Sequence, residues 1–203
     1  MHPEVEPLFR TTLQRDTNNR KDGLPAALHT DGTSSGMLCS SGEALEKLFP
    51  VLPTGSIHFV SANDWSICEL LLHFLNLTGP ADVYFTTWSL KEFGVRQLLS
   101  AMDSGAIRTL HALLDSRVKS RNPDVYFLAE RNFATVRLAE CHAKVCVIRS
   151  EKYSISIVGS ANFTNNPRIE AGVVCSYPPV AEFHCKWITD VIQNAHPFRN
   201  GSK

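Results

Sequence analysis

The sequence predicts an α/β fold: a mixed, largely parallel sheet flanked by helices on both faces. From about residue 55 onward, apolar strand-like runs alternate with segments of helical period. Repeated strand–helix–strand units are typical of parallel strands joined by crossover helices. Residues 141–164, CHAKVCVIRSEKYSISIVGSANFT, add two strands joined by a polar turn, and such a hairpin makes the sheet mixed.

The chain of 203 residues is long enough for one domain and an arm. Residues 1–36 are rich in polar residues and lack sustained periodicity. We therefore expect a polar N-terminal arm with a short element near residues 24–30. Residues 37–203 are expected to form a single domain, since the composition, 43% hydrophobic and 20% charged, is that of an ordinary globular protein.

Strands of this domain are predicted where short apolar runs end in polar residues. Besides the hairpin they lie at 56–62, 81–87, 106–115, 135–140 and 169–176. Ligands of open α/β sheets gather at the carboxyl ends of the strands. Three of these ends read SANDW, TTWS and DSRVKSR, so we expect a binding site there. The alternative is that they are ordinary polar loops.

Apolar stripes and capping residues predict the first helices. Ser41 is expected to cap a short helix, and residues 66–77 carry apolar side chains at helical spacing. Ser89 and Glu92 have the spacing of a capping box. The helix that they open is expected to end near Gly105.

Two further helices are predicted toward the C-terminal end. Asn122 followed by Pro123 is a typical helix start, because a proline at the first helical position needs no N–H group. The two prolines at 178–179 lead into a last helix. Its apolar residues are Phe183, Trp187 and Val191.

Charge and cysteine content narrow the possible partners. A formal net charge of zero argues against a general basic coat for nucleic acid, although a local basic patch remains possible. None of the six cysteines forms a C-x-x-C pair, and a zinc site at Cys141, His142 and Cys146 would lack a second ligand pair. We therefore expect no metal and no cofactor. No apolar run is long enough to span a membrane and the first residues lack the apolar region of a secretory signal, so we expect a cytoplasmic protein.

The hairpin carries polar residues for which a core has no use. His142 and Lys144 share one face of the first strand, and Ser160 and Asn162 share one face of the second. Pairing of the strands would bring them together at its open end, where Glu170 can return after the next turn. An imidazole can attack phosphorus, Lys and Asn can bind phosphate oxygens, and a carboxylate can orient the imidazole. The alternative is a solvated strand edge followed by a turn.

Residues at the predicted carboxyl-end loops are candidate substrate contacts. Basic side chains could contact phosphates and indole rings could stack on splayed bases. The candidates are Arg117, Lys119, Arg121, Arg168, Trp65 and Trp88. The alternative is a solvated basic turn with half-buried packing tryptophans.

HAK at 142–144 followed by GSANFT at 159–164 resembles the signature of the phospholipase D superfamily, H-x-K-x4-D-x6-G-S-x-N. Glu170 matches the acidic residue that often follows, and the pattern from about 55 to 195 looks like one domain of that family. The resemblance implies that His142 attacks phosphorus or protonates the leaving oxygen. It implies that Lys144 and Asn162 bind phosphate oxygens, with Ser160 assisting, and that Glu170 orients His142.

The sequence departs from this pattern in one residue and in spacing. Arg149 stands at the position of the family's Asp, and nine residues separate it from Gly159 where the pattern has six. An extended hairpin tip at 149–154 would account for both. The family's site usually needs two copies of the motif and this chain carries one, so the resemblance implies a homodimer with the site on the two-fold axis.

Three functions are compatible with these features. The leading hypothesis is a metal-independent phosphodiesterase, a nuclease that cleaves DNA through a covalent phosphohistidine. The second is a phospholipid or other small phosphodiester hydrolase of the same family, against which the lack of an amphipathic membrane helix counts. The third is a catalytically inactive nucleic-acid-binding module in which Arg149 marks a decayed site.

Overall fold

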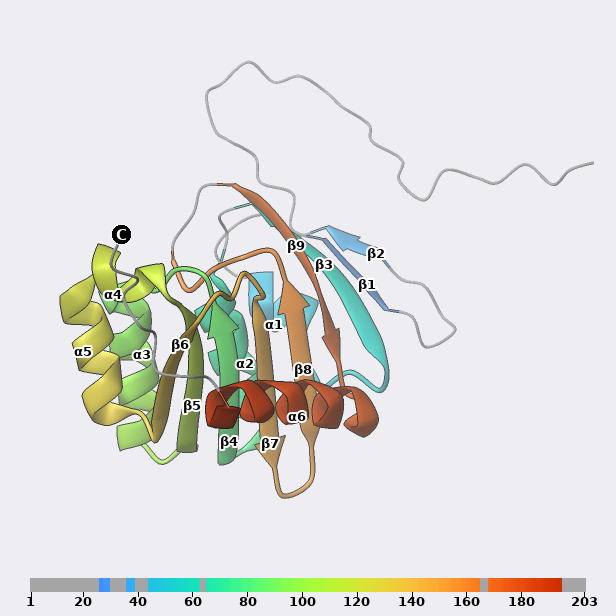
Figure 1. Ribbon diagram of the computed structural model, residues 1–203. Helices are drawn as coiled ribbons and strands as arrows, with labels where there is room; N and C mark the ends of the chain where they lie inside the picture. The colour runs from blue at the N-terminus through green and yellow to red at the C-terminus, as the bar shows by residue number, and fades with distance from the viewer. Residues whose placement is uncertain (1–25, 30–35, 39–43, 63–64, 165–167, 195–203) are drawn as a thin grey trace, which may run out of the picture.

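The computed structural model describes residues 26–29, 36–38, 44–62, 65–164 and 168–194 (Figure 1). In these residues nine strands form one sheet in the order β2-β1-β3-β9-β8-β7-β4-β5-β6. The strands are β1 (Ala26–His29), β2 (Gly36–Leu38), β3 (Ser56–Ala62), β4 (Ala81–Thr87), β5 (Ile107–Asp115), β6 (Thr135–Ala139), β7 (Val145–Ser150), β8 (Ser154–Gly159) and β9 (Ile169–Cys175). The helices are α1 (Ala44–Leu48), α2 (Ile67–Thr78), α3 (Glu92–Asp103), α4 (Arg117–Arg121), α5 (Pro123–Asn132) and α6 (Pro178–Asn194).

Most neighbouring strands of the sheet are antiparallel. Among the described strands, β4–β5 and β5–β6 are the parallel pairs. The antiparallel pairs are β1–β2, β1–β3, β3–β9, β8–β9, β7–β8 and β4–β7. The predicted mixed α/β sheet with helices on both faces is confirmed, but the expectation that it is largely parallel is wrong.

The reason lies in the crossover from β3 to β4. Sequential strands joined by a helix usually lie side by side and parallel, which is why the strand–helix–strand pattern predicted a largely parallel sheet. Instead β9, β8 and β7 lie between β3 and β4. The pairings still give β3, β4, β5, β6 and β8 one direction, so their carboxyl ends share one edge of the sheet. Because β7 and β9 run the other way, they begin at that same edge.

Part of the expected N-terminal arm belongs to the sheet. β1 lies within the stretch predicted to hold a short element, and residues 26–29 pair with residues 57–60 of β3. Residues 1–25 lie outside the described residues. That they form an arm separate from the domain stays a prediction. The predicted cap Ser41 also lies outside the described residues.

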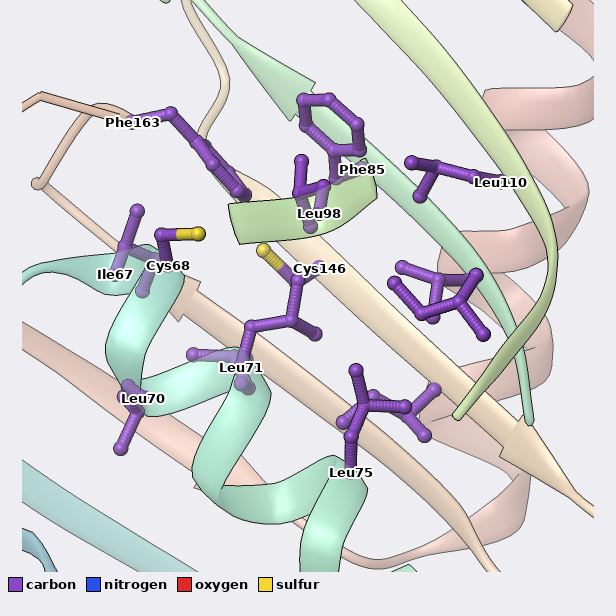
Figure 2. Packing of buried hydrophobic residues seen from close by; sticks show 14 of the residues in the cluster. Ile67, Cys68, Leu70, Leu71, Leu75, Phe85, Leu98, Leu110, Cys146 and Phe163 are labelled. Atoms are coloured by element: carbon purple, nitrogen blue, oxygen red, sulfur yellow. The ribbon is translucent and has the colours of Figure 1, made fainter. Parts of the chain in front are cut away.

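Helices cover the two faces of the sheet unequally (Figure 1). α6 crosses β4, β7 and β8 on one face, and the other helices lie on the opposite face or beside it. The larger core lies under α2, α3 and α5. Figure 2 shows part of it, with Leu71 of α2 close to Cys146 of β7 and Phe85 of β4 nearby.

The smaller core lies under α6 and differs from the predicted stripe. Its buried side chains on that helix are Ala181, Cys185, Ile188 and Ile192. Phe183 is 64% exposed, and Trp187 and Val191 pack at the margin of the cluster. Alternative helical stripes differ by a rotation of the helix about its axis, and here aliphatic residues and a cysteine face the sheet instead of the aromatic ones.

The capping box predicted for the start of α3 does not form, and a different capping box opens α2. α3 begins without a side-chain cap, so Ser89 and Glu92 form no capping box. The box that does form opens α2, where the backbone N–H of Glu69 donates to Ser66 Oγ (3.2 Å). In return the backbone N–H of Ser66 donates to Glu69 Oε2 (2.7 Å).

The remaining predicted boundaries mostly hold. Gly105 follows the end of α3 with φ of 77°, a value that suits glycine. Asn122 and Pro123 begin α5 as predicted. The stretch 115–121, expected to be a loop, contains the short helix α4.

Candidate active site

The two halves of the H-x-K…G-S-x-N motif lie beside each other at the edge where β7 begins and β8 ends. Val145 pairs with Val158, and the backbone N–H of Gly159 donates to the carbonyl oxygen of Lys144 (3.1 Å). The strands end there, so residues 141–144 and 160–162 form loops and not the predicted strand extensions. The hairpin therefore brings the motif residues together as expected, on loops at its open end.

Lys144 is a buried cation that lies against the imidazole of His142. Its ammonium group donates to the carbonyl oxygen of His142 (2.7 Å) and lies 3.3 and 3.4 Å from the two ring nitrogens. Lys144 is 8% exposed, whereas His142 is exposed. Burial lowers the pKa of Lys144 below its usual value, although the charges of Cys141, Glu170 and Asp115 act in the opposite direction.

Thr86 and Thr87, the last two residues of β4, hold the site together. Thr86 Oγ1 donates to the carbonyl oxygen of Ala143 (2.9 Å) and accepts from the N–H of Val145 (3.1 Å), which fixes the loop around His142 and Lys144. Both Thr86 and its neighbour Thr87 are buried. Sequence reasoning missed them, because threonines at the end of a strand give no specific signal.

Thr87 holds the other half of the motif. Its hydroxyl lies 3.3 Å from Asn162 Oδ1 and accepts from the N–H of Phe163 (3.4 Å). The same hydroxyl lies 2.8 Å from the carbonyl oxygen of Ser89 and has one proton to donate. In Asn162 the amide nitrogen is the group that can donate to a phosphate oxygen. Phe163 anchors the same loop, since its ring packs 4.5 Å from that of Phe85 in the core (Figure 2). Its carbonyl oxygen accepts from the N–H of Lys91 (3.2 Å).

Ser160 and Glu170 form a pair on the side of β9. Ser160 Oγ donates to the carboxylate of Glu170 and accepts from the N–H of Ala171 (3.0 Å). The charge of Glu170 also reaches the ammonium group of Lys144. The structure thus places Glu170 beside Ser160 and within electrostatic range of Lys144. Its predicted orientation of His142 stays a prediction.

Trp88 connects the motif to α4. The indole ring lies 5.7 Å from the imidazole of His142, at an interplanar angle of 63°. The guanidinium carbons of Arg117 and Arg121 lie 4.9 and 4.8 Å from the centre of the same ring. Three of the predicted contact residues therefore gather next to His142.

Asp115, which sequence reasoning did not select, fixes one of these arginines. It is 2% exposed and accepts from Arg117 Nε (2.6 Å), from the backbone N–H of Arg117 (3.1 Å) and from that of Cys141 (3.3 Å). Burial acts to raise its pKa, but these hydrogen bonds and the charge of Arg117 outweigh it, and the pKa of Asp115 lies below its usual value. The carboxylate thus ties α4 to the loop before His142.

The other predicted contacts lie apart from this cluster. The ring of Trp65 packs 5.0 Å from that of Phe59 within the core, which matches the alternative of a packing residue. Lys119 lies over Tyr126 and Phe127, on a different side of α4 from Trp88. Arg168 is exposed and immediately precedes β9.

Arg149 lies at the far end of β7. At about 3.3 Å per residue, roughly 16 Å of strand separates it from Lys144. Its guanidinium group contacts Cys185 Sγ (3.6 Å) and Glu182 (3.5 Å) of α6. The predicted extended tip is wrong, because residues 149 and 154 pair and the extra length lies in the strands. The residue that replaces the family's Asp is therefore remote from the motif's other members.

A cavity of about 180 Å³ lies elsewhere, behind the loop that follows Asn162. Phe163, Thr164 and the first residues of α2 and α3 line it, and the five motif residues do not. In the described part of the chain, no three His, Cys, Asp or Glu side chains are grouped so that they could bind a metal ion. None of the described helices combines the length and apolar character that crossing a membrane requires.

Comparison with solved structures supports the architecture. The structure is similar to Nuc from Salmonella typhimurium, a phospholipase D family member, with a TM-score of 0.50 and 18% sequence identity over 65% of this chain and 90% of that one. The chain has a phospholipase D-like fold. Neither the known family models nor the curated proteins match its sequence.

Two further solved structures are similar to part of this chain. Polyphosphate kinase from Porphyromonas gingivalis gives a TM-score of 0.50 at 11% identity, over 73% of this chain and 27% of that one. TrmBL2, an archaeal chromatin protein, gives 0.44 at 10% identity, over 67% of this chain and 52% of that one. At 11% identity the likeness to the polyphosphate kinase concerns the fold alone.

Proposed function

We propose that this protein is a metal-independent phosphodiesterase that cleaves DNA, with the site completed by a second copy of the chain. The observation that carries the proposal is the contact between the buried ammonium group of Lys144 and the exposed imidazole of His142. A buried cation costs free energy, so its retention beside a possible nucleophile suits a site that binds a phosphate anion. Asn162 lies on the adjoining loop with its amide nitrogen available as a further donor.

The proposed reaction has two steps. In the first, a ring nitrogen of His142 attacks phosphorus, a P–N bond forms, and the P–O bond to the leaving oxygen breaks. His142 of a second copy gives the leaving oxygen its proton. In the second step that imidazole takes a proton from water, the hydroxide attacks phosphorus, and the P–N bond breaks. Lys144 and Asn162 bind the non-bridging oxygens as their negative charge grows.

The proposed reaction needs two imidazoles, one as nucleophile and one as acid. Because one chain supplies one such imidazole, a second copy of the chain is required. His142 is exposed at the edge of the sheet, so it is accessible to a second molecule. An isologous dimer would place two copies of the same loop opposite each other, and each imidazole could then serve as nucleophile or acid. DNA is the proposed substrate because Arg117 and Arg121 lie beside the motif and are exposed.

The test is cleavage of plasmid and single-stranded DNA in excess EDTA by the wild type, by His142→Ala and by His58→Ala. His58 is an exposed histidine of β3 outside the motif, so it is a matched control. We expect cleavage by the wild type and by His58→Ala, an acid-labile phosphate adduct on His142, and no cleavage by His142→Ala. Sedimentation should give a dimer for all three proteins.

Three results would overturn this proposal. Unchanged cleavage by a folded, dimeric His142→Ala protein would remove the proposed nucleophile. DNA binding without cleavage by the wild type would favour the inactive binding module. Headgroup release from phospholipid vesicles, with no cleavage of DNA, would favour the lipid hydrolase.

A further inference from the structure

Trp88 holds two guanidinium groups beside His142. Arg117 and Arg121 are four residues apart on α4 and therefore lie on one side of the helix. Their guanidinium carbons lie 4.9 and 4.8 Å from the centre of the Trp88 ring. Each contact is a favourable cation–π interaction, but like charges four residues apart on a helix repel each other. One arginine would be enough to cover the Trp88 ring, so packing alone does not account for the second.

The charge of this cluster is only partly neutralised. Asp115 pairs with Arg117, whose side chain is still 51% exposed. Among the described residues no carboxylate is paired with Arg121, which is exposed. The indole N–H of Trp88 is buried and has no acceptor within the described part of the chain. The guanidinium groups of Arg117 and Arg121 thus present N–H donors and net positive charge to solvent, which are the features that bind a phosphate, whereas the buried indole N–H does not reach solvent.

We propose that Arg117 and Arg121, held by Trp88, form a second phosphate subsite that binds a phosphate adjacent to the one being cleaved. This inference rests on the proposed function and names the substrate class: a strand with consecutive phosphodiesters, and not a diester with a single phosphate. Lys144 and Asn162 hold the reacting phosphate. The arginines contact the Trp88 ring, which itself lies 5.7 Å from the imidazole of His142, and in this proposal they bind the next phosphate along the strand.

The subsite changes the function assigned to Trp88. The sequence predicted a platform for splayed bases, whereas the guanidinium groups already lie over this ring. Trp88 is then a positioning residue for the arginines. Recognition through phosphates carries no sequence information, so cleavage should not depend on base sequence.

The experiment compares two substrates. We measure kcat/KM for a single-stranded oligonucleotide and for bis(p-nitrophenyl) phosphate, which has one phosphate, with the wild type, Arg121→Gln and Arg131→Gln. Arg131 is an exposed arginine in the last turn of α5 and is the matched control. We expect Arg121→Gln to lower the ratio of oligonucleotide to single-diester kcat/KM about tenfold, and Arg131→Gln to change it by less than about twofold.

A binding measurement keeps the inference testable if the protein does not cleave. The affinity of a fluorescent oligonucleotide is measured at several salt concentrations with the same three proteins. Arg121→Gln should lower the slope of log affinity against log salt by about one, and Arg131→Gln should not.

Equal effects of the two substitutions, in either measurement, would overturn the subsite. Equal loss of both substrates in Arg121→Gln would place that arginine at the reacting phosphate instead. Cleavage of neither substrate by the wild type would refute the proposed function, while the binding slopes would still decide on the subsite.

Discussion

Replacing Lys144 with methionine separates what the site does for the reaction from what it does for the fold. Methionine has similar length and no charge, so it fills the space of the lysine stem without the ammonium group. Lys144 is 8% exposed, and its ammonium group lies against the imidazole of His142. Loss of one charged donor that binds a developing oxyanion costs about 10²- to 10³-fold in kcat. We therefore expect kcat for DNA cleavage to fall by that factor.

The same substitution should leave the protein at least as stable as the wild type at pH 7. Burial lowers the pKa of Lys144, which means that the folded protein binds this proton less tightly than the unfolded chain does. Between the lowered pKa and the ordinary value of 10.5, the unfolded chain holds more protons, so wild-type stability rises with pH there. Any stability advantage of Lys144→Met should therefore shrink as the pH approaches 10.5.

Two assays on the same preparation check this reasoning. DNA cleavage in EDTA gives kcat, and urea unfolding at pH 7 and at about pH 10 gives the free energy of unfolding. Lys119→Met, which removes an exposed lysine of α4, is the control. A variant that retains kcat within a few-fold would show that Lys144 does not bind the reacting phosphate. A loss of more than about 1 kcal/mol in stability would show that the ammonium group supports the fold.

Three further predictions follow from contacts in the fold and around the site. A Cβ at Gly172 would lie 2.5 Å from Phe59 Cζ and 2.6 Å from the Val158 carbonyl oxygen, so Gly172→Ala should lose about 1–3 kcal/mol in urea unfolding, partly restored by Phe59→Leu. Asp115 has a lowered pKa. Its contribution to the free energy of unfolding is therefore present above the ordinary pKa of 3.8 and is lost as the pH falls through the lowered pKa. Asp115→Asn should therefore be about 1 kcal/mol less stable at pH 7, with the difference vanishing in acid unfolding curves. Equal amounts of wild type and His142→Ala, after subunit exchange, should show about half the activity of that wild type alone, and undiminished activity would argue against a shared site.

The motif residues could be predicted because their spacing is local. His142 and Lys144 precede one strand of a hairpin and Ser160 and Asn162 follow the other, so any pairing close to register brings them together. The edge of the sheet at which the candidate site lies could also be predicted. Strand–helix–strand units place the carboxyl ends of their strands at one edge, and ligands of such sheets gather there. Local patterns therefore located the site without giving the strand order.

The order of the sheet could not be predicted, because β9, β8 and β7 insert between β3 and β4. Hydrophobic periodicity says which face of a strand is buried and does not say which strand lies beside it. The threonine hydroxyls of Thr86 and Thr87 were missed for the same reason. Their partners, Ala143 and Asn162, are 57 and 75 residues away in the chain. Asp115 was likewise read as the start of a basic loop.

The insertion of three late strands into the middle of the sheet has a consequence for how the chain folds. β3 has its partner β9 near the C-terminal end, and the hydroxyl of Ser176 donates to the carbonyl oxygen of Pro53 across 123 residues. During synthesis β3 and β4 therefore emerge long before the strands that separate them. The edge of β3 that will pair with β9 and the edge of β4 that will pair with β7 have no partner in that interval. Closing contacts of such long range is slow, and exposed strand edges favour aggregation. Ribosome-bound chains that end before β9 should thus be protease-sensitive, and the loops that carry His142 and Asn162 should be ordered only at the end of folding.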